Sequence, residues 1–378
     1  MSKWAGKYVI GLTGNIGTGK SVVRRMLEHN GAFGIDADSF SHRAIAKGAP
    51  GYQQVINTFG RWIVGPDGEI DRSRLGRLVF SDPEALAQLE AIVHPLVLQA
   101  VDWMVQRSNK SVVVIEAIKL LESNLRQTCD SIWVVTTPPE VQVTRLVQKR
   151  KMSDADARQR VTAQSPQEQK VALANVVINN AGTFEDTWKQ VMTAWQKIGQ
   201  PAEPAETAPA EKVETVSGTV SVARAKPRDA EHIARLNNRI HKDSQITTDE
   251  VMSAFGDKAF LLVRAGDRVV GSAGWQVENL VSRIADIVID PAVPVAHVLP
   301  PLVDAMERYS RDLQCEASLV FAAPDLSVDS LWQGVGYERR TPQSLGVAVW
   351  QEAARESLQP GQVLYFKQLR QDRVLRPI

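Results

Sequence analysis

The first half of the chain alternates short apolar runs with stretches in which apolar residues recur every three or four positions. The runs are YVIGLT (8–13), GAFGIDA (31–37), SVVVIEAI (111–118), DSIWVVTT (130–137) and NVVIN (175–179). Several are apolar throughout, which is typical of strands buried on both faces of a parallel sheet. The alternation predicts an α/β domain with a parallel sheet between helices.

The last helical stretch of this half has the clearest pattern. Its apolar residues share one helical face, at Phe184, Trp188, Val191, Met192, Trp195 and Ile198. Thr183 followed by Asp186 resembles a capping arrangement at the first turn. We interpret the aromatic stripe as core packing.

The second half has a different order of elements. The run AFLLVRAGDRVVGSAGWQV (259–277) predicts a β-hairpin that turns at Gly266 and Asp267. A strand IADIVID (284–290), a helix LPPLVDAMERYSRD (299–312) and a strand ASLVFAA (317–323) follow. This order predicts an α+β domain.

Between the halves lies QPAEPAETAPAEKVETVSG (200–218), with three Pro, four Ala and four Glu and no Ile, Leu or aromatic residue. A segment of this composition buries too little apolar surface to offset its loss of conformational entropy. We therefore predict a linker at 200–218 that joins one domain at 1–199 to a second at 219–378.

The composition is that of a soluble globular protein, with 44% hydrophobic and 23% charged residues. The 44 Lys and Arg nearly balance the 43 Asp and Glu, so no nucleic acid partner is expected. No apolar run has the length of a signal peptide or a membrane span, and we expect a cytoplasmic protein with no membrane partner. Cys129 and Cys315 form no metal-ligand or redox pattern, and we interpret them as buried thiols in a reducing compartment.

The stretch GNIGTGKS, directly after the first apolar run, matches the phosphate-loop pattern G-x-x-x-x-G-K-[ST]. A strand precedes it and a helix follows it, so backbone N–H groups and the helix N-terminus would converge on phosphate oxygens. Lys20 would reach the β- and γ-phosphates of ATP, and the Ser21 hydroxyl would bind Mg²⁺. The residues predicted to hold the nucleotide are Gly14, Asn15, Ile16, Gly17, Thr18, Gly19, Lys20 and Ser21.

Asp36 and Asp38 follow the second apolar run, at the strand end where α/β proteins place ligands. A carboxylate there would accept a proton from an acceptor hydroxyl or hold Mg²⁺ through water. The structural alternative is that one of these residues caps the next helix.

Arginines are dense after the fourth apolar run. A phosphoryl-transfer site needs mobile cations over the γ-phosphate, and a solvated helical face is the structural alternative. The arginines concerned are Arg145, Arg150, Arg158 and Arg160.

Together these motifs resemble those of dephospho-CoA kinases. The likeness covers residues 7–199 and includes GLTGNIGTGKS (11–21), GIDADSFSHRAI (34–45), IVHPLV (92–97), VIEAIKLLES (114–123) and TRLVQKRKMSDADARQRVTAQ (144–164). It implies a P-loop kinase fold. It also implies transfer of phosphate from ATP to the ribose 3′-hydroxyl of dephospho-CoA, a small-molecule substrate, in the last step of CoA biosynthesis.

The resemblance assigns roles to single residues. Asp38 matches the catalytic base of the family. Lys20 and Arg145 match the cations that stabilise the γ-phosphate, and Arg150 matches a second lid arginine.

Three further matches concern the ends of the two substrates. His94 and Arg43 match residues on the acceptor side, although a structural role for His94 beside a turn proline stays open. Asn180 matches an asparagine in the segment that the family places near adenine.

The chain departs from the family pattern in two places. The family often has Asp-(apolar)-Pro-Leu-Leu-Phe-Glu where this chain reads EAIKLLE (116–122), so Ile118 and Lys119 replace the Pro-Leu pair and imply a differently shaped acceptor side. Asn175 and Asn179 stand where Asp is usual, which removes two negative charges. Neither change affects the residues expected to be catalytic, and we expect the activity to survive.

The second half resembles GNAT acetyltransferases in the order of its elements and in WQGVGYERR (332–340). Those enzymes bind a pyrophosphate on N–H groups of a glycine-containing loop. The corresponding stretch PAVPVAHVLPP (291–301) has no glycine and four prolines, which supply no N–H group. We expect a GNAT-like domain without transferase activity.

Two alternatives stay open. One is a P-loop kinase for another small acceptor, with an active acetyltransferase as its second half. The other is a regulator that binds a nucleotide and transfers nothing. Asp38 with Arg145 and Arg150 favours a kinase, because a protein that only binds nucleotide needs neither a base nor lid cations.

Overall fold

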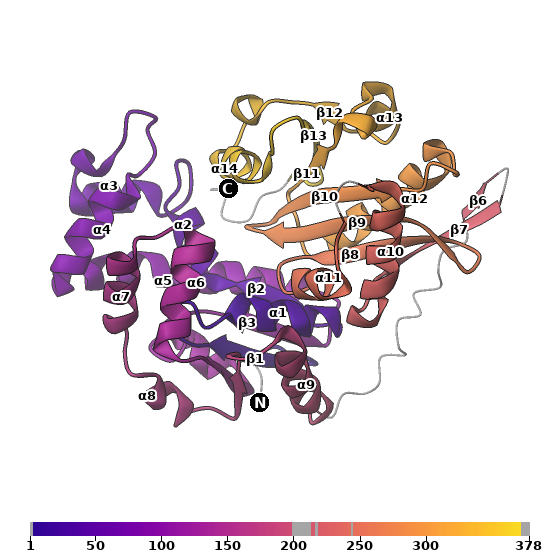
Figure 1. The fold of residues 1–378 in the computed structure, drawn as a ribbon. Helices are drawn as coiled ribbons and strands as arrows, with labels where there is room; N and C mark the ends of the chain where they lie inside the picture. Colours follow the sequence, from indigo (N-terminus) through magenta and orange to yellow (C-terminus); the bar gives the residue numbers. More distant parts are fainter. Residues whose placement is uncertain (1–2, 199–212, 216–217, 243–244, 372–378) are drawn as a thin grey trace. The chain divides into compact units, whose positions relative to one another are not determined.

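The computed structural model of the chain describes residues 3–198, 213–215, 218–242 and 245–371. They form two compact units that divide between Val191 and Met192, and each unit has its own β-sheet (Figure 1). Most of the linker predicted at 200–218 lies outside the described residues. Within that segment Val213–Thr215 forms a short strand, β6, so the second sheet takes in residues that precede position 219.

The first sheet has five strands in the order β2-β3-β1-β4-β5, and every neighbouring pair is parallel. The strands are β1 (Tyr8–Thr13), β2 (Phe33–Asp36), β3 (Val112–Glu116), β4 (Ser131–Thr136) and β5 (Val176–Asn179). All five lie within the apolar runs, which confirms the predicted parallel sheet. The residues of β3 are all buried, which explains why that run is apolar on both faces.

Helices fill the connections of this unit. They are α1 (Lys20–His29), α2 (Ala37–Ala44), α3 (Tyr52–Phe59), α4 (Arg72–Ser81), α5 (Pro83–Arg107), α6 (Pro139–Arg150), α7 (Asp154–Thr162), α8 (Gln167–Val171) and α9 (Phe184–Gln196), with 3₁₀ turns η1 (Arg61–Ile63) and η2 (Asn124–Thr128). His94 and Pro95 lie in the interior of α5, not at a turn. Pro95 removes one backbone donor, but α5 continues because Val97, Ala100, Val101 and Met104 bury its apolar face.

The capping arrangement at the start of α9 is confirmed. The Asp186 N–H donates to Thr183 Oγ1 at 3.1 Å, and the Thr183 N–H donates to Asp186 Oδ2 at 3.1 Å. The ring of Trp188 stacks on Phe184 and meets His29 of α1 edge-on. Trp188 of the stripe thus contacts α1 and Val191 is buried, whereas Phe184, Met192, Trp195 and Ile198 are half-buried.

The second sheet has the order β12-β13-β11-β10-β9-β8-β7-β6. Its strands are β6, β7 (Gly218–Arg224), β8 (Ala259–Ala265), β9 (Arg268–Glu278), β10 (Val281–Ile289), β11 (Ala317–Ala322), β12 (Glu338–Arg339) and β13 (Val363–Gln368). Only the pair β10 and β11 is parallel among the strand pairs of its described residues. The hairpin β8–β9 turns at Gly266, whose φ of 60° suits glycine, so the hairpin prediction is confirmed.

Helices cover both faces of this sheet, as expected for an α+β unit. They are α10 (Ala230–Ile240), α11 (Thr248–Ala254), α12 (Val295–Asp312), α13 (Asp329–Gly334) and α14 (Ala348–Ser357), with turns η3 (Pro227–Asp229), η4 (Pro324–Leu326) and η5 (Pro342–Ser344). Along β11, Val320 packs in a cluster with residues of α12, and Leu319 and Phe321 pack with Trp350 of α14. This alternation with a period of two explains why β11 is apolar throughout.

The proline-rich stretch 291–301 is not one loop. Helix α12 begins at Val295, so Pro300 and Pro301 lie inside it and only residues 290–294 connect β10 to the helix. The expectation of four loop prolines was therefore wrong for two of them. The apolar face of α12, which includes Leu302 and Met306, is fully buried on the sheet, and this packing outweighs the helical hydrogen bonds that the two prolines cannot make.

Candidate active site

The topology of the first sheet marks where a ligand would bind. The chain leaves the central strand β1 toward β2 and leaves β3 toward β4, on opposite sides of the β1–β3 pair. In open α/β sheets, ligands bind at the carboxyl ends of the strands where the connections diverge. The segments that follow β1, β2 and β3 meet this condition. They contain the phosphate loop, Asp38 and Ile118.

Three glycines give the phosphate loop its shape. Gly14, Gly17 and Gly19 have φ values of 149°, 75° and 89°. A Cβ atom on Gly14 would lie 2.4 Å from the Val135 carbonyl oxygen, and one on Gly19 would lie 2.1 Å from Nδ2 of Asn180. Only glycine fits at these two positions, because the neighbouring backbone and amide leave no room for a side chain.

Asn180 and Arg145 hold the loop from outside. The Asn180 amide donates to the Thr18 carbonyl at 2.8 Å and accepts from the Thr187 hydroxyl at 2.9 Å. The Arg145 guanidinium donates to the Asn180 carbonyl at 2.7 Å and to the Thr18 carbonyl at 3.3 Å. Sequence reasoning placed these two side chains on the nucleotide, and the structure joins both of them to the backbone of the phosphate loop.

The arginine-rich segment 144–164, which carries the predicted lid arginines, also leads to contacts with the phosphate loop. The Ile16 N–H donates to Gln164 Oε1 at 2.6 Å, and the Asn15 amide donates to the Ser165 carbonyl at 3.1 Å. Ile16 also packs against α6 and α7 in a small apolar cluster with Val143, Leu146 and Ala157. The end of this segment is therefore hydrogen-bonded to the phosphate loop, and its helices pack against Ile16 of that loop.

Arg150 and Arg158 of this segment differ in their surroundings. Arg150 is exposed at the end of α6, and its charge is one of the influences that lower the pKa of Lys20. Arg158 forms ion pairs with Asp154 at 2.8 Å and Glu140 at 3.0 Å on the surface. Arg158 therefore lies on a solvated helical face, which is the structural alternative, whereas the charge of Arg150 acts on Lys20 of the phosphate loop.

Lys20 is buried at the first position of α1, and its ammonium donates to the Asn15 carbonyl at 3.3 Å. Burial lowers its pKa, and the negative charges of Glu116 and Asp38 oppose this shift. The two carboxylates favour the charged form of Lys20, and a buried cation beside the phosphate loop is suited to receive the negative charge of a phosphate.

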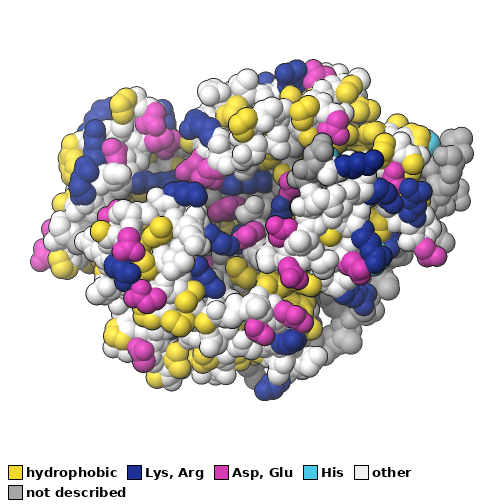
Figure 2. All heavy atoms as spheres, in the orientation of Figure 1, with side chains coloured by type: hydrophobic (Ala, Val, Ile, Leu, Met, Phe, Trp, Pro, Cys, Tyr) yellow, Lys and Arg dark blue, Asp and Glu magenta, His cyan; other side chains and the backbone are white. Residues whose placement is uncertain are grey.

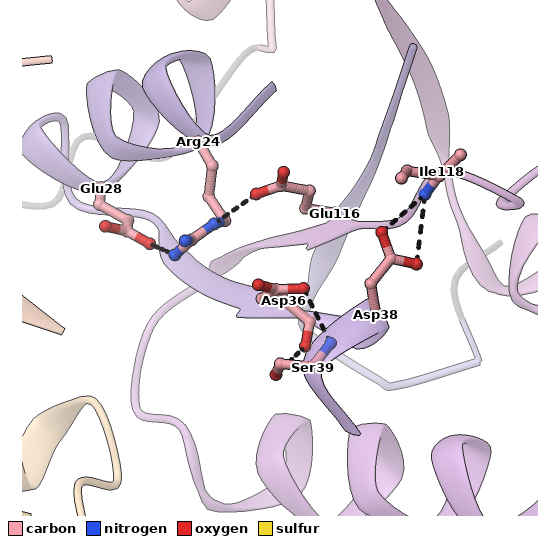
Figure 3. A network of polar contacts seen from close by, with 7 residues as sticks. All are labelled: Arg24, Glu28, Asp36, Asp38, Ser39, Glu116 and Ile118. Atoms are coloured by element: carbon pink, nitrogen blue, oxygen red, sulfur yellow. Dashed lines mark hydrogen bonds and ion pairs between the residues drawn. The ribbon is translucent and has the colours of Figure 1, made fainter. Parts of the chain in front are cut away.

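The two aspartates after β2 have different partners (Figure 3). Asp36 caps α2, because its Oδ1 accepts the Ser39 N–H at 3.1 Å. Asp38 points toward the segment after β3, where its Oδ2 accepts the Ile118 N–H at 3.1 Å. The capping role that the sequence left open therefore belongs to Asp36. The Asp38 carboxylate lies at the edge of the sheet that the carboxyl ends of the strands form.

The pKa of the Asp38 carboxyl is raised, chiefly by burial and further by the charge of Glu116. Lys20, the Ile118 N–H and Lys170 oppose the rise. A carboxylate whose pKa is raised while cations lie beside it has the properties of a general base.

A buried ionic network lies behind the aspartates (Figure 3). The Arg24 guanidinium contacts Glu116 Oε2 at 2.8 Å and Glu28 Oε1 at 2.5 Å, and all three residues are buried. The closeness of Glu28 also explains Gly34, where a Cβ atom would lie 1.8 Å from Glu28 Oε1. Arg24 thus neutralises the carboxylate at the end of β3, and no motif in the sequence indicated this pairing.

Two further residues of the site were not predicted. The Lys170 ammonium of α8 donates to the Ile118 carbonyl at 3.0 Å, and the Thr13 hydroxyl donates to the same carbonyl at 3.1 Å. Lys170 is buried. Ile118 acts through its backbone, which no side-chain pattern reveals, and Lys170 lies in a polar segment without a motif.

The acceptor-side candidates lie on neighbouring helices. Arg43 is buried on α2, the helix that carries Asp38, and His94 is half-buried on α5. Helices α2 and α5 pack against each other. The two side chains therefore belong to the same part of the first unit as Asp38.

Other chemistry is scarce in the part of the chain that the structure describes. It contains no group of three or more His, Cys, Asp or Glu residues arranged to hold a metal ion, and none of its helices is both long and apolar enough to cross a membrane. Both cysteines are free thiols, Cys315 buried and Cys129 half-buried, and burial raises the pKa of Cys129 to about 12. Figure 2 shows acidic and basic side chains interspersed over the visible face.

The central phosphate loop and the parallel order of the sheet place the first unit among P-loop phosphotransferases. The family model described as dephospho-CoA kinase matches residues 8–186. A curated dephospho-CoA kinase from Carboxydothermus hydrogenoformans is 42% identical over 192 residues, which are 50% of this chain and 93% of that protein. Through its N-terminal half, the chain belongs to the dephospho-CoA kinase family, whose members use ATP as phosphate donor.

Solved structures are similar to each half. A dephospho-CoA kinase from Campylobacter jejuni is 24% identical, covers 51% of this chain and 97% of its own, and has a TM-score of 0.36. For the C-terminal part, a GNAT-family acetyltransferase from Staphylococcus aureus Mu50 is 12% identical, covers 40% of this chain and 99% of its own, and has a TM-score of 0.33.

Proposed function

We propose that this chain transfers the γ-phosphate of ATP to the ribose 3′-hydroxyl of dephospho-CoA, giving CoA and ADP. The observation that carries the proposal is the position of Asp38. Its carboxylate lies at the strand edge beside the buried Lys20, at the carboxyl ends of β1, β2 and β3. A base and a phosphate-binding cation thus share one site.

The nucleotide end of the site would work through its backbone and its cations. The N–H groups of residues 14–21 and the N-terminus of α1 would bind the phosphates. Lys20, Arg145 and Arg150 would collect the charge that develops on the transferred group. Arg145 already contacts the loop carbonyls, so binding requires only a rearrangement of its guanidinium.

The acceptor end would use Asp38 as general base. Its carboxylate accepts the proton of the attacking hydroxyl while the Ile118 N–H keeps the group oriented. Arg43 and His94 are proposed to bind the acceptor, and Asn180 is proposed to support the nucleotide end through its contact with Thr18. These roles are the ones that the resemblance to dephospho-CoA kinases implies for the same positions.

Mg²⁺ is proposed as the metal of this reaction. Ser21, the second residue of α1, supplies a hydroxyl oxygen directly beside the loop. Such a hard oxygen ligand suits Mg²⁺, which keeps several waters and takes its other ligands from substrate phosphates. When bound, the ion would neutralise charge on the β- and γ-phosphates.

The proposal is tested by ATP consumption with purified full-length protein. Dephospho-CoA, AMP and shikimate are offered side by side, and the Asp38→Ala variant serves as control. We expect turnover with dephospho-CoA alone and its loss in the variant. Turnover confined to AMP or shikimate would assign another acceptor, and binding of ATP without turnover would leave a regulator.

The domain organisation proposed with this activity is a kinase domain at 1–199, a linker that begins at 200 and a second domain at 219–378. Strand β6 at Val213–Thr215 extends the sheet of the second domain into the end of the segment predicted as linker. The separate sheets of the two compact units support it. We also propose that the protein acts in the cytoplasm on small molecules, without a nucleic acid or membrane partner. Its formal net charge of +1 supports the absence of an electrostatic partner of that kind.

The second domain is proposed to lack acetyltransferase activity. The turn between β10 and α12 has only residues 290–294, and Pro291 and Pro294 supply no N–H group for a pyrophosphate. Hydrogen exchange of the full chain with acetyl-CoA tests this locally. We expect no added protection over Val295–Asp312, and saturable protection there would overturn the proposal.

A further inference from the structure

Ile118 connects three elements of the kinase site. Its N–H donates to the Asp38 carboxylate, at 3.1 Å from Oδ2 and 3.4 Å from Oδ1. Its carbonyl oxygen accepts from the Lys170 ammonium at 3.0 Å and from the Thr13 hydroxyl at 3.1 Å. The residue that orients Asp38 is therefore itself held by a charged group from α8 and by the strand that leads into the phosphate loop.

Lys170 is placed unusually for a lysine. It is the fourth residue of the short helix α8, and only 5% of its surface is exposed. A lysine is rarely buried so far unless its ammonium has partners. Its recorded hydrogen-bond acceptor is a backbone carbonyl, and the negative charges of Glu122 and Asp38 raise its pKa against the lowering effect of burial. The ammonium thus lies within electrostatic reach of the proposed base.

Charged groups of both signs surround Asp38. Lys20 at the start of α1 and Lys170 of α8 favour its ionised form, as does the Ile118 N–H. Glu116 at the end of β3 opposes ionisation, and Asp36 before α2 is a second negative charge nearby, although Arg24 pairs with Glu116. Lys20 will be engaged with the phosphates of ATP during the reaction. Lys170 then still lies within electrostatic reach of the base.

We propose that Lys170 is a positioning residue for Asp38. Its ammonium fixes the Ile118 backbone, which orients the carboxylate, and its charge keeps that carboxylate ionised after ATP has engaged Lys20. The inference rests on the proposed role of Asp38 as general base. No contact of Lys170 with either substrate is required.

The direct test measures the titration of Asp38 itself in the full-length chain. Aspartate labelled with ¹³C at the carboxyl carbon gives a signal that Asp38→Asn assigns. We expect the midpoint to move to higher pH in Lys170→Met and to stay at the wild-type pH in Lys170→Arg. Lys119→Met is the matched control. It also removes a lysine charge one residue from Ile118, but that ammonium is exposed and paired with Glu90, so the Asp38 midpoint should not move.

Kinetics separates this inference from the proposed function. If the positioning role and the kinase activity both hold, Lys170→Met lowers kcat by about tenfold or more at pH values below the titration midpoint of Asp38, with little change in KM for ATP. Lys170→Arg should have the kcat of the wild type. A moved Asp38 midpoint with an unchanged pH profile of kcat would sustain the positioning role and remove Asp38 as base. An unmoved midpoint in a folded Lys170→Met protein would overturn the inference and leave the kinase proposal intact.

If Lys170→Met fails to fold, Thr13→Val tests the same carbonyl. This variant keeps the charge of Lys170 and removes the second donor to the Ile118 oxygen. We expect a smaller loss of kcat with the Asp38 midpoint still close to that of the wild type. A large move of the midpoint in Thr13→Val would contradict the assignment of the charge effect to Lys170.

Discussion

The Asn180 side chain donates its amide hydrogen to the Thr18 carbonyl at 2.8 Å, which ties the end of β5 to the phosphate loop. Asn180 is buried, and its amide oxygen accepts from the buried Thr187 hydroxyl. Asn180→Ala should therefore lower the free energy of unfolding by about 1–3 kcal/mol and raise KM for ATP. Thermal unfolding and steady-state kinetics measure the two effects.

The neighbouring residue offers a control for that variant. Asn179 is exposed, and its amide oxygen accepts the Ala181 N–H. Asn179→Ala should change the free energy of unfolding by less than about 1 kcal/mol and leave KM for ATP unchanged. Equal effects of the two variants would mean that the Thr18 contact has no special role.

Gly19→Ala should abolish ATP binding. The position has a φ of 89°, and the new Cβ atom would collide with the Asn180 amide, so the loop must change shape. Gly48→Ala is a matched control, because Gly48 has a φ of 80° with nothing within 4 Å of its Cβ position. The control should lose about 1–2 kcal/mol of stability from strain alone and still bind ATP, as calorimetric titration would show. Retained affinity in Gly19→Ala would contradict the geometry of the loop.

Asp38→Ala should lower kcat by roughly 10²- to 10⁴-fold and leave the affinity for ATP close to that of the wild type. The reason is that Asp38 acts on the acceptor hydroxyl and makes no contact needed for the phosphates. Single-turnover kinetics with dephospho-CoA and equilibrium ATP binding separate the two quantities. A variant that turns over at the normal rate would end the candidacy of Asp38 as base.

Asp36 makes the stability of the protein depend on pH. Its pKa is raised from 3.8 to about 6, first by burial and then by the charge of Glu116, with Arg24 opposing. The folded state therefore holds this proton more tightly than the unfolded state, and the resulting stabilisation is lost as pH rises from about 4 to about 6.

The variant that tests this dependence is Asp36→Asn, which keeps an oxygen to accept the Ser39 N–H. It should unfold at higher temperature than the wild type at pH 7 and lose much of the decline between pH 4 and pH 6. Ser39→Ala keeps the carboxyl group and should keep the decline. Thermal unfolding across that pH range gives the answer, and an unchanged slope in Asp36→Asn would refute the assignment.

In the second unit, Glu307→Ala should lower the free energy of unfolding of the sheet. Glu307 is buried and contacts Lys367 and Arg311, each at 2.6 Å. Because Arg311 and Lys367 are partly exposed and stay hydrated in the variant, the loss is that of hydrogen bonds to a charged group, about 1.5–3 kcal/mol. Hydrogen exchange of β11 and β13 in the full chain measures the loss. Glu231→Ala breaks a pair of the same spacing with Arg235 on the surface, and its effect should stay below about 1 kcal/mol.

Much of the fold was predictable because it rests on local signals. The central strands β1, β3 and β4 of the first sheet are apolar runs because they bury both faces, and the capping pair at Thr183 and Asp186 is a short-range contact. The helix predicted at 299–312 is present, but the reading of 291–301 as one loop was wrong, because α12 begins at Val295 and its packing on the sheet is not visible in local sequence.

The candidate site divides in the same way. The sequence by itself determined the phosphate loop, because its glycines and lysine must stand at fixed spacing. Position after a strand indicated Asp36 and Asp38 alike, and the resemblance to the kinase family selected Asp38 and Arg145. Only the tertiary structure decided that Asp36 caps a helix while Asp38 accepts the Ile118 N–H. It also decided that Lys170 donates to the carbonyl of Ile118. The contacts of Ile118 join residues that are distant along the chain through backbone groups, and backbone groups leave no pattern in the order of side chains. The Asp36 cap spans three residues, and only the structure shows that Asp36 makes it.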